Sequence, residues 1–286
     1  LCVEKVLQLE IPPRAQLIRV LMDELTRLAS HQLWWGALAM DLGAFTPFFY
    51  AFREREMINE IMEETCGARL TMNYIVPGGV MFDLHPDFVR KVKEFLALFK
   101  SKIHEYDELV TGNVIFQSRT QGVGVISKED AISFGCTGPT GRGSGFSCDV
   151  RKHYPYEIYQ QLQFDEVLET GGDSWSRYKV RVGEMIQSMR IIEQLIDNIP
   201  EGEIQAKTKA VLKLPKGDFY SRVETARGEL GVYIVSEGGT TPYRIKFRSP
   251  GFSNLSALDH MVRGGKLGDL MATMGTLDLV IPDIDR

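Results

Sequence analysis

Apolar residues recur at intervals of three and four along much of this chain, which is the spacing of helices that bury one face. The longest such run opens at Pro12-Pro13 and continues to Met40. Shorter runs with the same period cover residues 52–65, 86–110, 128–134, 173–198, 255–262 and 267–275. Residues 231–235 and 242–247 alternate between apolar and polar side chains, and the glycine-containing segment between them is typical of a hairpin loop. The pattern predicts an α+β fold that is predominantly helical, with a small antiparallel β element.

A length of 286 residues suits one large domain. We expect a single domain over residues 1–286, with a helical core over 1–110, a glycine-rich irregular segment over 111–170, and a long helix, hairpin and helical tail over 171–286. Because the chain begins at Leu1, within a helical pattern, we expect that its N-terminal part is missing. Acidic and apolar residues alternate over 278–286, which fits an edge strand or a frayed end.

Composition narrows the classes of function. Hydrophobic residues make up 44% of the chain and charged residues 25%, as in ordinary globular proteins. The net charge is -5 and the basic residues are scattered, so nucleic acid is not an expected partner. The sequence has neither an apolar run of membrane-spanning length nor a secretion signal at its start, which predicts a soluble or peripheral protein.

Neither the cysteines nor the glycine-rich loop forms a recognised cofactor motif. Four cysteines stand at positions 2, 66, 136 and 148, without a CxxC pair and without histidines at zinc-ligand spacing. A bound metal or cluster is therefore not expected, although distant cysteines could still meet in space. Residues 138–145, beside Arg142, could cradle an anion, but they match neither GxGxxG nor the Walker pattern. We expect a loop of tight turns there.

Asp41 is a carboxylate inside a run of apolar and aromatic residues. Helical spacing places Trp34, Leu38 and Asp41 on one face, so the acid would point where the apolar residues point. Burial would raise its pKa, which is how proton-handling sites are usually made. Gly43 and Pro47 support the alternative of a helix end with a solvated edge. Spacing alone leaves both interpretations open.

The histidines form no evident catalytic arrangement. His31 lies ten residues before Asp41 on the same helical pattern, about 15 Å away along the axis, so we expect it to pack between helices. His153 is expected on a surface loop. No Ser/His/Asp or Cys/His order stands out for nucleophilic catalysis.

Several blocks of the sequence resemble the 49-kDa subunit of respiratory complex I, which is the D subunit of the bacterial NADH:quinone oxidoreductase. The blocks are residues 12–20, 41–57, 66–69, 77–79, 142–145, 149–151, 181–185, 228–236, 250–252 and 285–286. The resemblance implies a helical core like that of the nickel-iron hydrogenase large subunit. The C-terminal cysteine pair that helps to hold nickel in hydrogenases has no counterpart at 278–286, where soft thiolate ligands are replaced by acids and apolar residues.

The resemblance also implies a function and a set of partners. The family subunit binds no cofactor or metal of its own in the peripheral arm of the proton-pumping enzyme. With the small cluster-bearing subunit it forms the cavity where quinone, as ubiquinone or menaquinone, is reduced by the iron-sulfur cluster of that neighbour. A membrane subunit at the quinone entrance is a further expected partner, and the cytoplasmic face of the bacterial cell membrane is the expected location. The chain alone is expected to be inactive.

The resemblance assigns roles to particular residues. The tyrosine and histidine that hold the quinone headgroup in the family would precede Leu1. Asp41 matches the family acid that pairs with that histidine, which implies that it orients the imidazole and helps to supply protons. If the chain folds alone, we expect a raised pKa for Asp41 and an apolar crevice beside it. The positions that match the cavity or its surroundings are His31, Trp34, Ala37, Phe48 and Phe49, and the family often has threonine where this chain has Ala37.

Three other functions remain open at this point. The chain could be a D-type subunit of a related quinone or methanophenazine oxidoreductase fed by ferredoxin or a deazaflavin. It could be a membrane-bound hydrogenase-like large subunit, which nickel analysis would reveal. It could also act only as an adaptor that docks neighbouring subunits.

Overall fold

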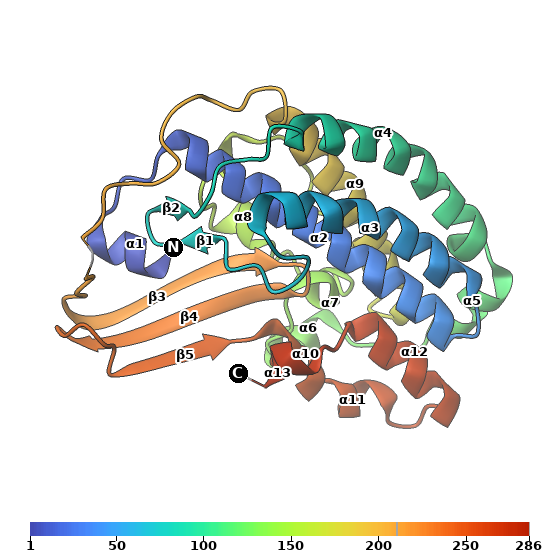
Figure 1. Ribbon diagram of the computed structural model, residues 1–286. Coiled ribbons are helices and arrows are strands. Elements are labelled where there is room, and N and C mark those ends of the chain that lie inside the picture. Colours follow the sequence, from blue (N-terminus) through green and yellow to red (C-terminus); the bar gives the residue numbers. More distant parts are fainter. Residues whose placement is uncertain (210, 286) are drawn as a thin grey trace.

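Long helices lie on one side of the molecule and a three-stranded sheet on the other (Figure 1). The computed structural model describes residues 1–209 and 211–285, so Arg286 of the matched closing pair lies outside the described residues. The helices are α1 (Cys2–Leu7), α2 (Pro13–Asp41), α3 (Thr46–Cys66), α4 (Phe88–Tyr106), α5 (Val114–Thr120), α6 (Lys128–Ser133), α7 (Gly138–Arg142), α8 (Val150–His153), α9 (Ser174–Leu195), α10 (Pro250–Ser256), α11 (Leu258–Val262), α12 (Leu267–Leu277) and α13 (Ile281–Ile284). The strands are β1 (Ile75–Val76), β2 (Gly79–Val80), β3 (Lys216–Thr225), β4 (Gly228–Glu237) and β5 (Arg244–Arg248).

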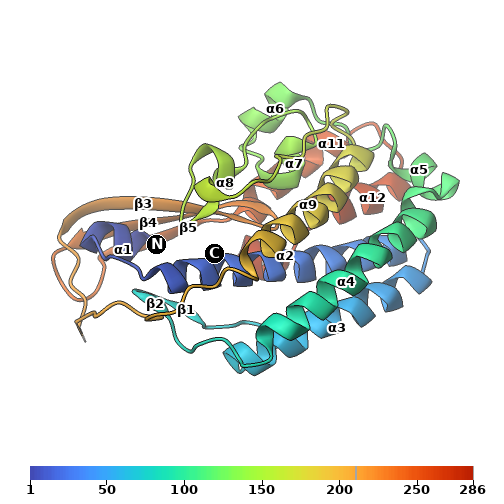
Figure 2. The same ribbon diagram turned by 90° about the horizontal axis from the view of Figure 1, so that it is seen from above.

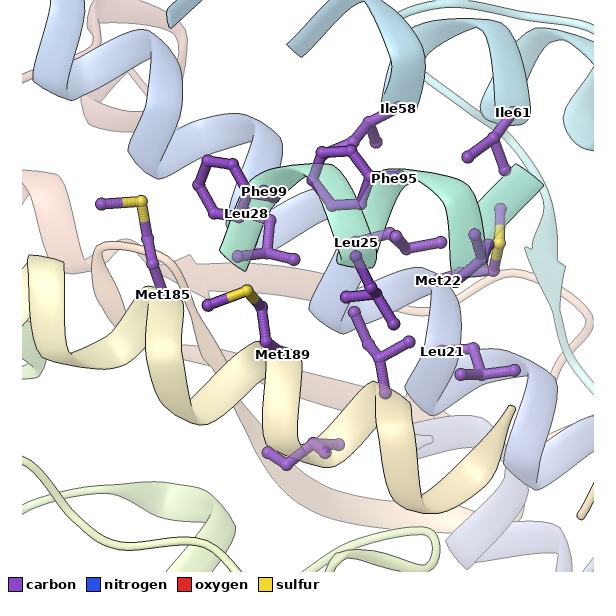
Figure 3. Close-up of a cluster of buried hydrophobic side chains, with 14 of the residues drawn as sticks. Leu21, Met22, Leu25, Leu28, Ile58, Ile61, Phe95, Phe99, Met185 and Met189 are labelled. Atoms are coloured by element: carbon purple, nitrogen blue, oxygen red, sulfur yellow. The ribbon is translucent and has the colours of Figure 1, made fainter. Parts of the chain in front are cut away.

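Helix α2 is central to the helical side. Figure 2 shows α2, α3 and α4 running side by side, with α9 packed along α2. The apolar stripes of these four helices meet in one buried cluster (Figure 3). Its members include Leu21, Leu25 and Leu28 of α2, Ile58 and Ile61 of α3, Phe95 and Phe99 of α4, and Met185 and Met189 of α9. The predicted helical, α+β fold class is confirmed.

Two of the predicted helices differ from the structure at their ends. Helix α3 begins at Thr46, six residues before the predicted start. Pro47 falls in its first turn, where the missing N–H of proline costs no helical hydrogen bond. Helix α4 ends at Tyr106, and residues 107–111 continue it as one wider π-helical turn.

The sheet has the antiparallel order β3-β4-β5. Strands β4 and β5 confirm the predicted hairpin, and Val232 pairs with Phe247 across it. Strand β3 was not predicted, because Asp218, Tyr220 and Arg222 give it a polar appearance. A second, two-residue hairpin forms where a turn was expected, and its Gly79 bridges to Gln205.

Two local predictions were wrong. Residues 138–142 form the buried helical turn α7, with Pro139 in the first turn, although a loop was expected over 138–145. Residues 281–284 form the short helix α13 and no edge strand, because Pro282 lies in its first turn and cannot donate to a sheet. Within the described residues, no helix combines the length and apolar character needed to span a lipid bilayer.

Candidate functional site

A crevice of about 340 Å³ opens between the C-terminal half of α2 and α12. Its volume lies at the lower end of the range for small-molecule sites. Most of its walls are apolar, with charged groups at a few points. It is lined by Leu33, Trp34, Ala37, Leu38 and Asp41 of α2, by Met271, Met274 and Gly275 of α12, by Asp278, Leu279 and Val280 after α12, and by Arg227.

Trp34 and Gly275 set the width of the crevice. The indole Nε1 of Trp34 donates a hydrogen bond to the Gly275 carbonyl oxygen at 2.7 Å, which ties α2 to α12. A Cβ at position 275 would lie 2.7 Å from Leu38 Cδ1, closer than side-chain carbons approach. Glycine therefore permits the close approach of the two helices.

Asp41 is the last residue of α2, and its side chain is exposed. Gly43 follows with a φ of 97°, in the left-handed region that ends a helix. The burial expected for Asp41 is thus absent, and the solvated helix end describes these surroundings correctly. The apolar crevice expected beside Asp41 is present.

The structure brings three of the six expected site residues together. Asp41, Trp34 and Ala37 line the crevice. His31 is fully buried behind Trp34, and the two rings meet edge to face with centroids 6.5 Å apart. Phe48 and Phe49 lie on α3 outside the crevice lining. They contact each other in an aromatic cluster with Phe52, and Phe49 is exposed.

Sequence analysis missed an ion pair in the crevice. Arg227, in the turn between β3 and β4, lies with its Nε 3.3 Å from Asp278 Oδ2. Asp278 follows α12 with a φ of 56°, which turns the chain sharply at this point. The alternation of acidic and apolar residues over 278–286 is visible in the sequence, but no sequence pattern links Asp278 to Arg227.

A network of buried charges lies behind the crevice. Its members come from α2, α7, α8 and the residue before it, α9 and β3, and each is at most 3% exposed. They are Glu24, Arg27, His31, Arg142, Asp149, Arg151, Glu184 and Glu224. Within the described residues, no group of three or more His, Cys, Asp or Glu side chains is arranged to hold a metal ion.

Arg142 joins two carboxylates at the centre of this network. Its Nη1 donates to Glu224 Oε1 at 2.9 Å, and its Nε donates to Glu184 Oε1 at 3.1 Å. Glu184 Oε2 lies 2.8 Å from His31 Nε2. Glu184 thus connects the guanidinium of Arg142 to the imidazole behind the crevice.

Glu24 lies at the opposite end of the network. Its carboxylate accepts hydrogen bonds from Tyr159 at 2.7 Å and Ser188 at 2.6 Å. Arg151 donates to Glu24 at 3.0 Å and to Asp149 at 2.7 Å. Every carboxylate in the network therefore has a cationic partner, as buried charges require.

Burial and ion pairing shift the pKa values of the carboxylic acids in this network in opposite directions. Burial alone would raise the pKa of Glu184, but the charge of Arg142 outweighs it and lowers that pKa well below its usual range. At Glu224 burial prevails over Arg142, and the pKa is raised. Burial also lowers the pKa of His31, against the hydrogen bond that His31 donates to Glu184, so the imidazole is neutral at pH 7.

Arg181 of α9 connects the network to the crevice wall. Its guanidinium lies over the Trp34 ring, 4.8 Å from the centroid, and it donates to the Thr276 carbonyl at 2.6 Å. Arg181 is fully buried. Sequence patterning missed it because arginine usually indicates a solvent-facing position.

Fold and site together define a class of protein: a mainly helical α+β domain with an apolar crevice backed by buried, hydrogen-bonded charges. The family model described as "Respiratory-chain NADH dehydrogenase, 49 Kd subunit" matches residues 41–286. This chain belongs to that family.

Curated relatives agree with this assignment. The C/D subunit of the NADH-quinone oxidoreductase of Bacteroides thetaiotaomicron is 54% identical over 286 residues, which is 100% of this chain and 54% of the relative. The corresponding D 2 subunit of Solibacter usitatus is 47% identical over 100% of this chain and 77% of the relative. The D subunit of Geobacillus kaustophilus is 46% identical over 99% and 77%. The chain thus spans about half the length of the C/D relatives that it matches.

Proposed function

We propose that this chain forms one wall of the quinone-reduction cavity in a proton-pumping NADH:quinone oxidoreductase. The observation that carries the proposal is the apolar crevice between α2 and α12, where Trp34 and Ala37 lie beside the carboxylate of Asp41. A planar, apolar ring with polar carbonyl oxygens suits such a crevice, because the ring contacts Trp34 while its oxygens reach charged groups. The names of the curated relatives support the same reaction.

In this proposal Asp41 handles protons without itself contacting the ring. As an exposed carboxylate at the end of α2, it can orient a histidine from another part of the complete protein and stabilise the imidazolium form. Electrons come from the iron-sulfur cluster of the small partner subunit, and this chain binds no cofactor. The membrane subunit at the quinone entrance completes the cavity, at the cytoplasmic face of the cell membrane.

The test uses the assembled enzyme with Asp41→Asn. We expect quinone-dependent NADH oxidation to fall at least about tenfold, because loss of a positioned proton donor typically costs that much or more. Transfer of electrons from NADH to a hydrophilic artificial acceptor should be unchanged. Asp165→Asn is the matched control, since Asp165 is 78% exposed and forms only a surface ion pair with Arg190.

Two outcomes would favour other functions. Unchanged quinone reduction in Asp41→Asn, with normal assembly, would leave only a docking role for this wall. Stoichiometric nickel in the purified enzyme would instead indicate hydrogenase-like chemistry.

A further inference from the structure

The imidazole of His31 has one buried nitrogen without a hydrogen-bond partner among the described residues. Its Nε2 lies 2.8 Å from the Glu184 carboxylate, which can only accept, so Nε2 carries the proton. Nδ1 then holds a lone pair and contacts no donor. A buried acceptor in this state costs free energy, and it offers a place for a second proton.

The charges around His31 balance before that second proton is added. Four carboxylates are fully buried near it, those of Glu24, Asp149, Glu184 and Glu224, against the four guanidinium groups of Arg27, Arg142, Arg151 and Arg181. Glu184 and Arg181 face the imidazole from α9, and Arg27 faces it from α2. With a neutral imidazole and all four carboxylates ionised, this set carries no net charge. Because burial raises the pKa of Glu224, a proton bound there would make the set positive and oppose a proton on His31 further.

Two further arginines nearby have acids of their own. The charge of Arg177 is opposed by Asp173, and Arg227 pairs with Asp278 in the crevice. A proton on His31 would therefore add one uncompensated positive charge to a buried region, which is unfavourable unless a negative charge arrives beside it.

Trp34 is the contact between His31 and the crevice. The imidazole meets one edge of the indole at a centroid distance of 6.5 Å, and the same indole lines the crevice. A ring packed on Trp34 would lie about 9 Å from His31, and one negative charge at that distance raises the proton affinity of the imidazole about twentyfold at an effective dielectric constant of about 20.

We propose that His31 takes up one proton from solvent at Nδ1 when the ligand in this crevice carries a negative charge. The ligand class is an acidic, quinone-like ring that binds as its anion. One proton is bound, no electron moves, and the imidazolium stays paired with Glu184 through Nε2. The proposal rests on the proposed function, because it takes the crevice to be the quinone site.

Two other groups could bind the proton instead. Asp41 is exposed at the mouth of the crevice, where water screens the charge of a ligand. Glu224 has a raised pKa, but it lies on the far side of Arg142 from Glu184 and His31. Along this chain of contacts, His31 is closer to the indole of Trp34 than Glu224 is. Because His31 is buried, water also screens it less from the charge of a ligand than it screens Asp41.

The experiment measures proton uptake on ligand binding to the assembled enzyme. The probes are an alkyl hydroxynaphthoquinone, whose acidic enol is ionised at neutral pH, and its uncharged methyl ether. Calorimetric titration at pH 7 in buffers of different ionisation enthalpy gives the protons bound per ligand. We expect a fraction of a proton, up to about 0.6 per ligand, with the anion and about none with the ether.

The decisive variant is His31→Gln, whose amide can still donate to Glu184 but cannot take up a proton. Proton uptake with the anion should fall below about 0.1 per ligand, while the ether still binds. Wild-type enzyme that binds the anion without proton uptake would overturn the proposal. So would unchanged uptake in His31→Gln, or loss of uptake in Asp41→Asn or Glu224→Gln but not in His31→Gln.

Failure of the proposed function gives a different result. In that case neither probe binds to the wild-type enzyme, and quinone reduction is insensitive to Asp41→Asn. Binding of both probes with loss of activity in Asp41→Asn, but without proton uptake by His31, would retain the proposed function and refute this inference.

Discussion

Replacing Arg142 by methionine should destabilise the chain more than any change to a surface ion pair. The substitution removes a charge that is fully buried between Glu184 and Glu224 and leaves both carboxylates without it. Breaking a buried pair by deleting one partner costs about 3–5 kcal/mol. Because two carboxylates lose the same partner, we expect a cost of about 4 kcal/mol or more at pH 7.

The pH dependence of this cost tests its origin. Without Arg142, the buried carboxyls bind protons in the folded variant that the unfolded chain does not hold at pH 7. The stability of the variant should therefore rise as the pH falls from 7 towards 5, by up to about 1.4 kcal/mol per pH unit for each proton. The difference from the wild-type chain narrows over the same range.

Urea unfolding followed by circular dichroism measures these free energies. Arg190→Met is the matched control, because its pair with Asp165 is exposed and should cost less than about 1 kcal/mol. Adding Glu184→Gln and Glu224→Gln to Arg142→Met should recover most of the loss. A cost no greater than that of the control, or one independent of pH, would refute the assignment of Arg142 as the central cation.

Three other substitutions test separate parts of the fold. Gly79→Ala places a Cβ against the Ile204 carbonyl and should cost about 2 kcal/mol or more, seen as a lower Tm by calorimetry. Burial would raise the pKa of Glu4, but its hydrogen bond from Arg19 prevails and lowers it to about 2. Glu4→Gln should therefore lose about 3 kcal/mol at pH 7 in urea unfolding, a gap that closes as the pH falls from about 4 towards 2. Gly275→Ala narrows the crevice and should raise the quinone KM several-fold in the assembled enzyme, with electron transfer to a hydrophilic acceptor unchanged.

The helices that were predictable from the sequence are those with an uninterrupted apolar stripe. The stripe of α9, from Val180 to Leu195, gave its position to within a few residues. Strand β3 was hidden because its two buried residues, Ser221 and Glu224, are polar, so no apolar alternation appears there. Alternation indicates a strand only when water faces one side and hydrocarbon the other.

The site was predictable only in part, for a related reason. Asp41 stood out because an acid rarely follows so many aromatic residues. Helical spacing placed Trp34 on the same face, and the family resemblance added Ala37. Arg227 and α12 lie far along the chain, and no local pattern reports that they close the crevice. The partners of Arg142 lie 42 and 82 residues away in the sequence, so no local pattern showed that these three charged residues are buried together.

Helix α2 has 18 of its 29 residues buried, and it faces the apolar core, the charge network and the crevice at once. A side chain substituted on this helix must fit the apolar core, the charge network or the crevice, depending on its position. Few positions of α2 are therefore free to vary. During evolution, α2 should therefore change more slowly than α4, which has 7 buried residues out of 19. The members of the charge network should change together or not at all, because each single replacement removes a hydrogen-bonding or ionic partner from at least one buried charged group.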